Sequence, residues 1–176
     1  PSPRPPLPLP PTGPNTLRVA VIADSNGPYG SIAQGAGVAP AVAALAGPLA
    51  PDIVIHNGDL VAGQKRGLPR ATLDAMWDEY GRAVIAPLRE RGIPLVPVPG
   101  NHDASPRRDL PDRAAYVAAF TRPEHVPAVT FVARADYPFE YAFLFKQALF
   151  VVLDAPTGRL SRRQVAFVDR VLKAHP

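Results

Sequence analysis

Three short clusters of polar side chains are the part of this sequence best suited to chemistry. Each cluster follows an apolar run rich in Val or Ile, a pattern typical of buried parallel strands. Because ligands of α/β sheets bind outside the carboxyl ends of the strands, we expect the three clusters to converge on one site. The runs cover residues 17–23, 53–56 and 93–98, and the polar residues that follow them are Asp24, Asn26, Asp59, Asn101, His102 and Asp103.

Carboxylates, amide oxygens and an imidazole would meet at such a site, and this donor set suits Mn, Fe or Zn. The chain has no Cys, so thiolate ligands are excluded. The carboxylates of Asp24 and Asp59 would repel each other unless cations neutralised them. Two metal ions would do so while generating a hydroxide nucleophile and polarising a phosphate. His102 could then protonate the leaving oxygen, with Asp103 holding the ring in the required tautomer.

The clusters resemble, in order, spacing and preceding strand, the first three signature blocks of the calcineurin-like metallophosphoesterases. The matching stretches are Asp24-Ser25-Asn26, Gly58-Asp59 and Gly100-Asn101-His102-Asp103. The resemblance extends over nearly everything from Leu17 onward. It implies a four-layer α-β-β-α sandwich that hydrolyses phosphate mono- or diesters at a dinuclear centre, with a small phosphoester as substrate.

The resemblance also implies a role for each residue. Asp24 binds one metal ion, Asp59 bridges both ions, and Asn101 binds the second. His102 is the acid or a transition-state stabiliser. Asn26 stands where the first block usually has a His ligand; its amide oxygen could ligate more weakly, or the residue could instead cap the loop.

The family's later blocks, a lone His after a strand and then Gly-His-x-His, are absent from this sequence. His125 lies in a Pro-flanked loop and His175 follows a predicted helix, so neither replaces them. We therefore expect residues 17–176 to form the first half to two-thirds of such a domain, and this chain alone to be inactive. An alternative is a non-catalytic binding or scaffold protein that has lost metal ligands, which Asn26 and the missing histidines favour.

The order of elements from the first cluster to the third predicts a parallel sheet with right-handed crossovers. The first helix is expected from about residue 32 to 46, capped by Ser31 and stopped at Gly47-Pro48. The second is an amphipathic helix over residues 73–91 with Gly92 as its C-cap residue. Its Met76 and Trp77 are expected in the core, as is His56, which would be hydrogen-bonded there.

The second half of the sequence predicts antiparallel structure. After a short helix over residues 111–120, apolar residues alternate over 139–145 and a second apolar run covers 148–154, which indicates a hairpin that turns at Lys146-Gln147. Ser161 and Gln164 form a capping-box pattern that predicts a final helix.

Composition narrows the remaining possibilities. The net charge of +4 is spread along the chain, which does not favour a nucleic-acid interface, and no apolar run approaches the length of a membrane span. Arg107 and Arg108 could contact substrate phosphate or stay in solvent. The Pro-rich residues 1–16 predict an extended tether, and such a tether suits a protein exported to the periplasm or outside the cell after removal of a signal.

Overall fold

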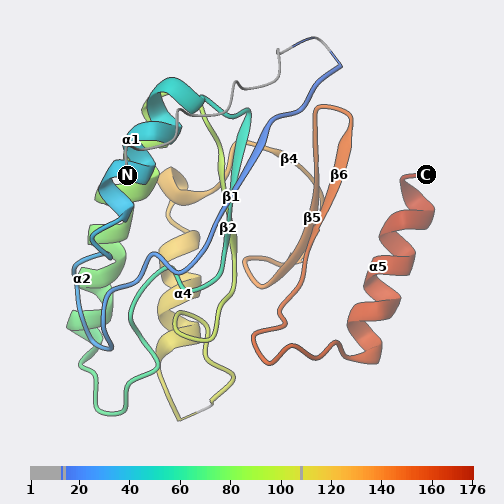
Figure 1. Cartoon of the computed structure of the whole chain (residues 1–176). Helices are drawn as coiled ribbons and strands as arrows, with labels where there is room; N and C mark the ends of the chain where they lie inside the picture. Colours follow the sequence, from blue (N-terminus) through green and yellow to red (C-terminus); the bar gives the residue numbers. More distant parts are fainter. Residues whose placement is uncertain (1–12, 14, 108) are drawn as a thin grey trace, which may run out of the picture.

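The computed structural model describes residues 13, 15–107 and 109–176, so most of the predicted tether and Arg108 lie outside the described part of the chain. Four layers follow one another across the molecule (Figure 1): helices, a parallel sheet, an antiparallel sheet and a last helix. This confirms the predicted α/β class and the α-β-β-α order. None of the described helices combines the length and apolar character needed to cross a bilayer.

The parallel sheet forms where the three Val- and Ile-rich runs were predicted as strands. It contains β1 (Val19–Ile22), β2 (Ile53–Asn57) and β3 (Leu95–Val98), in the order β1-β2-β3. Ile22 lies opposite His56, and Asn57 lies opposite Val98, so the three strands finish at the same edge. The turns that carry the polar clusters therefore leave the sheet side by side.

Helices cover one face of this sheet. The first is α1 (Val38–Ala44), which continues into the wide turn η1 (Leu45–Leu49). Residues 70–90 form one long helical segment, as predicted, made of α2 (Arg70–Tyr80), η2 (Gly81–Ile85) and α3 (Ala86–Glu90). It ends at Gly92, whose φ of 69° suits a residue without a Cβ. The predicted short helix is α4 (Asp112–Phe120), followed by the turn η3 (Pro123–His125).

The predicted start of the first helix is wrong, because α1 begins at Val38 and not near residue 32. The intervening residues form a loop closed on itself: the N–H of Gly35 donates to the carbonyl of Ser25 at 2.8 Å. Asn26 also pairs with Gln34 in an isolated β-bridge. These bonds take the backbone groups that a longer helix would have used.

The antiparallel sheet contains β4 (Thr130–Asp136), β5 (Glu140–Phe145) and β6 (Ala148–Val152). Strands β5 and β6 are the predicted hairpin, whereas β4 was not predicted. The final helix, α5 (Arg162–Ala174), starts with the predicted capping box: Ser161 accepts from the N–H of Gln164, and the Gln164 side chain accepts from the N–H of Ser161.

Three clusters of buried apolar side chains lie between the four layers of secondary structure. Val54 packs with the helices, while its neighbour Ile53 packs between the two sheets with Tyr141 and Phe143. Phe167 of α5 covers the outer face of the antiparallel sheet. Strand β2 is thus buried on both faces, as expected for the centre of a parallel sheet.

The core positions predicted in the helical layer are confirmed. Met76 and Trp77 are fully buried. His56 is buried too, and its Nδ1 lies 2.6 Å from the hydroxyl of Tyr80. Burial lowers the pKa of His56 to about 3, so the ring is neutral at ordinary pH.

Candidate metal centre

The first two signature turns are joined through their backbones. Asp24 and Asp59 both have left-handed backbone conformations, with φ values of 54° and 56°. The N–H of Asp24 donates to the carbonyl of Gly58, and the N–H of Asn26 donates to the carbonyl of Asp59, both at 3.2 Å. Non-glycine residues held in this region are concentrated at functional sites, where the surroundings fix them.

The third turn packs directly on the second. A Cβ on Gly58 would lie 3.0 Å from the Cα of Gly100, and a Cβ on Gly100 would collide with the backbone nitrogen and Oδ1 of Asp59. The N–H of His102 donates to Asp59 Oδ1 at 3.0 Å. The structure therefore brings together all three turns that the sequence placed at one site.

The ring of His102 lies among three side chains of the site. Its Nε2 is 3.9 Å from Asp59 Oδ2, and its Nδ1 is 3.4 Å from the Nδ2 of Asn26. In the neutral ring, Nδ1 can accept from this amide NH₂ while Nε2 carries the ring proton. Tyr29 stacks on the ring, with centroids 4.5 Å apart and planes at 29°.

Asp103 does not orient His102 as the sequence suggested. Its carboxylate accepts from the N–H groups of Leu60, at 2.9 Å, and Gly100, at 3.0 Å, and is almost completely buried. No hydrogen bond between Asp103 and His102 exists in the described part of the chain. Burial raises the pKa of Asp103 to about 7. Asp103 therefore links the second turn to the third through hydrogen bonds. The imidazole of His102 is instead contacted by Asn26.

Sequence reasoning missed two residues of the site, Tyr29 and Gln64. The Oε1 of Gln64 accepts from the Nδ2 of Asn101 at 3.2 Å and from the hydroxyl of Tyr29 at 3.3 Å. Both residues lie in loops, each five positions after a signature Asp. That spacing is the only trace of their role in the sequence.

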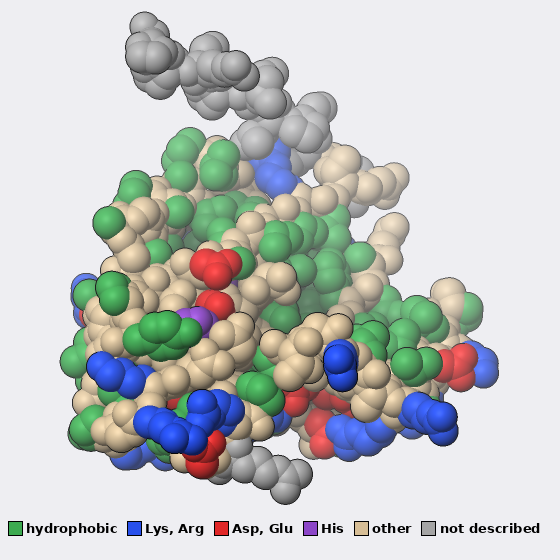
Figure 2. Space-filling model, turned by 60° about the horizontal axis from the view of Figure 1, so that its bottom comes forward, with side chains coloured by type: hydrophobic (Ala, Val, Ile, Leu, Met, Phe, Trp, Pro, Cys, Tyr) green, Lys and Arg blue, Asp and Glu red, His purple; other side chains and the backbone are tan. Residues whose placement is uncertain are grey.

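Basic side chains lie beside this centre. Figure 2 shows the end of the molecule where the parallel strands finish: acidic side chains and a histidine lie beside hydrophobic groups and several Lys and Arg. Lys65 packs against Gly30, with its Nζ 3.1 Å from the position of a Cβ there. Arg66 and Arg107 share one counter-charge, Asp109, at 3.3 and 3.1 Å. We call Lys65, Arg66 and Arg107 the basic rim.

The donor atoms decide whether a metal ion fits this centre. No group of three or more His, Cys, Asp or Glu side chains placed to hold a metal ion occurs among the described residues. Here two carboxylates are supplemented by amides, those of Asn26 and Asn101. The carboxylate of the exposed Asp24 has neither a hydrogen bond nor an ion pair within the described part of the chain. An oxygen-rich set with one uncommitted carboxylate fits a cation that accepts oxygen ligands.

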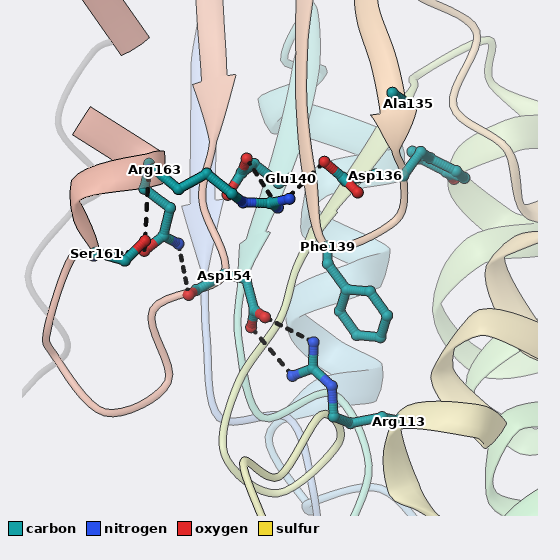
Figure 3. Close-up of a pocket in the computed structure, with 10 residues that line it drawn as sticks. Arg113, Ala135, Asp136, Phe139, Glu140, Asp154, Ser161 and Arg163 are labelled. Carbon is teal, nitrogen blue, oxygen red and sulfur yellow. Dashed lines mark hydrogen bonds and ion pairs between the residues drawn. The ribbon is translucent and has the colours of Figure 1, made fainter. Parts of the chain in front are cut away.

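A hollow of about 520 Å³ lies between α4, the β4–β5 turn and the start of α5 (Figure 3). Arg113 reaches across it to the carboxylate of Asp154 at 2.6 Å and donates to the carbonyl of Ala104 at 3.2 Å. Its guanidinium also lies 3.9 Å from the centroid of Phe139. Arg163 pairs with the acidic groups at the β4–β5 turn. The charges of this hollow mainly neutralise one another, and Arg113 connects it to the third signature turn.

Comparison with known families agrees with this geometry. The family model described as calcineurin-like phosphoesterase matches residues 17–162. The chain therefore belongs to the calcineurin-like phosphoesterase family, whose members are generally phosphoester hydrolases that use divalent metals. Comparison with curated proteins gives no match to this chain.

Proposed function

We propose that this site hydrolyses phosphate mono- or diesters with two metal ions, Mn, Fe or Zn. The observation that carries the proposal is the junction of three strand-end turns at Asp59, which His102 contacts through both its backbone and its ring. Asp24, Asp59 and Asn101 would hold the metal ions, with Asn26 as a weaker ligand. When bound, the ions would supply a hydroxide nucleophile and polarise the phosphate.

The residues of the chain itself would position and move the proton. In its imidazolium form, His102 would donate the proton of Nε2, the nitrogen that lies 3.9 Å from Asp59 Oδ2, to the leaving oxygen and become a neutral ring. Asn26 contacts the ring at Nδ1, and Tyr29 restricts rotation of the ring by stacking on it. The basic rim would attract the anionic substrate, because Arg66 and Arg107 share the single carboxylate of Asp109 and Lys65 adds a third positive charge.

A non-catalytic relative that keeps the fold is the second candidate. It is favoured by Asn26, whose amide nitrogen contacts His102 where a His ligand is usual in the family. In that case the centre would be a structural polar junction that binds little metal. Metal affinity therefore separates the two candidates.

The test measures Mn²⁺ bound to the purified chain by equilibrium dialysis, with Asp59→Asn as the site variant. Asp169→Asn is the control, because Asp169 lies on α5 and pairs with Lys173. We expect the parent and the control to bind Mn²⁺, and Asp59→Asn to bind at least about tenfold more weakly. A parent protein without bound metal would support the scaffold.

Turnover is the second measurement, with one monoester and one diester as substrates. We expect this chain alone to be inactive, because its predicted ligands all bind through oxygen and the family's histidine ligands are not among them. Full turnover is expected in a form of the protein that also supplies those histidines. Rapid metal-dependent hydrolysis by this chain alone would show that its own ligands suffice.

A further inference from the structure

Gln64 occupies a backbone position that its surroundings force on it. Its φ is 61°, in the left-handed region that side chains other than Gly, Asn and Asp seldom adopt. The N–H of Gln64 donates at 3.1 Å to Oδ1 of Asp112, a buried carboxylate on the first turn of α4. The preceding Gly63 has no room for a side chain, since a Cβ there would meet the carbonyl of His102 and Asp112 Oδ1. The loop is thus held from two sides.

The side-chain oxygen of Gln64 accepts two hydrogen bonds. Asn101 Nδ2 donates to Gln64 Oε1 at 3.2 Å, and the hydroxyl of Tyr29 donates to the same atom at 3.3 Å. An Asn side chain has one donor group and one acceptor atom. Because the donor group of Asn101 is used by Gln64, its Oδ1 is left as the free ligand atom.

We propose that Gln64 is a positioning residue that fixes the amide of Asn101, so that oxygen and not nitrogen faces the metal site. The inference rests on the proposed function, because it assigns Asn101 Oδ1 to a metal ion. An amide free to flip would present its NH₂ to the cation in a fraction of the molecules, and would bind it more weakly. Groups that orient a metal ligand typically contribute roughly 10–100-fold to affinity.

Tyr29 extends the same arrangement to the proposed acid. Its hydroxyl holds Gln64, while its ring stacks on His102. One chain of contacts therefore runs from the ligand Asn101 through Gln64 and Tyr29 to His102. Tyr29→Phe, which keeps the ring but loses the hydroxyl, should weaken Mn²⁺ binding less than replacement of Gln64, because the bond from Asn101 to Gln64 is retained.

The first experiment compares Mn²⁺ affinity in the parent, Gln64→Met and Gln64→Glu, measured from the electron paramagnetic resonance signal of free Mn²⁺. Gln147→Met is the control, since Gln147 is an exposed residue in the β5–β6 turn. We expect Gln64→Met to weaken binding roughly 10–100-fold. Gln64→Glu, which keeps an acceptor oxygen, should bind at least as well as the parent. Urea unfolding of each variant shows that the fold is retained.

The decisive comparison repeats Gln64→Met in an Asn101→Asp background. A carboxylate has two equivalent oxygens, so its flip changes nothing and Gln64 has no orientation to enforce. There we expect Gln64→Met to change Mn²⁺ affinity by no more than about twofold. An equal loss in both backgrounds would mean that Gln64 only shapes the loop, and the inference would fail.

A metal-free measurement checks the same contact. The side-chain amide signal of Asn101 in an ¹H–¹⁵N spectrum, assigned by its disappearance in Asn101→Asp, should move in Gln64→Met and stay in place in Gln147→Met. If the parent binds no Mn²⁺, the proposed function fails and the inference fails with it. If the parent binds Mn²⁺ while Gln64→Met binds equally well, the inference alone is overturned.

Discussion

His102 donates its backbone N–H to Oδ1 of Asp59 at 3.0 Å, while its ring Nε2 lies 3.9 Å from Oδ2 of the same carboxylate. The proposed acid and the proposed bridging ligand are therefore held together by the main chain, and only the second contact depends on the imidazole. This separation allows the ring to be removed without removing the support of Asp59.

Replacing His102 by Ala should lower turnover far more than metal content. The variant keeps the N–H that holds Asp59 but loses the proton donor, and general acid catalysis contributes roughly 10²–10⁴-fold. The measurement is kcat together with bound metal in a catalytically competent form of the protein. A variant that lost its metal while keeping the parent's turnover per bound ion would assign His102 to ligation instead.

Gly100→Ala should damage the centre through packing. A Cβ at this position would collide with the backbone nitrogen of Asp59, so the second and third turns must separate. Overpacking of this kind lowers the free energy of unfolding by about 1–3 kcal/mol, and we expect Mn²⁺ binding to weaken with it. Urea unfolding and equilibrium dialysis measure the two effects.

The matched control is Gly37→Ala, because Gly37 has a φ of −79° and no atom within 4 Å of an added Cβ. This variant should change the free energy of unfolding by less than about 1 kcal/mol. Equal behaviour of the two variants would contradict the close approach of Gly100 to Asp59.

The buried His56 should make the protein less stable in acid. Burial lowers its pKa from 6.5 to about 3, so between these values the unfolded chain binds a proton that the folded chain does not. The stability that depends on a neutral His56 is fully present above pH 6.5. As the pH drops toward 3, the free energy of unfolding falls by about 1.4 kcal/mol per pH unit for one proton. Tyr80, its hydrogen-bond partner, stays neutral throughout, because burial raises the pKa of that hydroxyl.

His56→Gln tests this, because Gln can still hydrogen-bond to Tyr80 but does not titrate. Urea unfolding at several pH values between 4 and 6, a range chosen to lie within the predicted window, should give a slope against pH shallower by about one proton than in the parent. Parallel slopes for the two proteins would show that His56 is not the titrating group.

Lys65→Ala should raise KM with little change in kcat. Lys65 lies on the basic rim beside Gly30 and has no part in the proposed proton transfer. Its charge would therefore contribute to attraction of the anionic substrate. Steady-state kinetics of a catalytically competent form of the protein at low and high salt measure this, and salt should reduce the difference. Lys173→Ala on α5 is the control. A fall in kcat without a change in KM would place Lys65 in the chemical step.

The sheet and the convergence of the turns could be predicted because local patterns determine them. Apolar runs that end in polar residues indicate buried strands and their carboxyl ends, and Ser161 with Gln164 marks a helix start within four residues. The start of α1 could not be predicted this way. Residues 32–37 are compatible with a helix locally, and backbone contacts between Ser25 and Gly35 decide otherwise.

Strand β4 was missed for a related reason. Its sequence, from Thr130 to Asp136, alternates poorly, and its pairing with β5 is interrupted by two shifts of register. The hydrogen bonds of Gln64 and Asp103 could not be predicted from local sequence patterns either. Gln64 meets Asn101 across 37 residues of sequence, and Asp103 meets Leu60 across 43. Such contacts exist only once the sheet has brought the turns together.

The position of β1 in the parallel sheet also bears on the motion of the centre. Strands β1 and β3 lie at the two edges of the described sheet, but β1 leaves the Val21 side chain 64% exposed, whereas Leu95 and Val96 of β3 are buried. Strand β2 is flanked by a strand on each side. Amides of β2 should therefore exchange with deuterium most slowly, and those of β1 earlier, through local opening. Because Asp24 follows β1, its turn can open while Asp59 and Asn101 stay together, so among the proposed metal ligands we expect Asp24 to release a metal ion first.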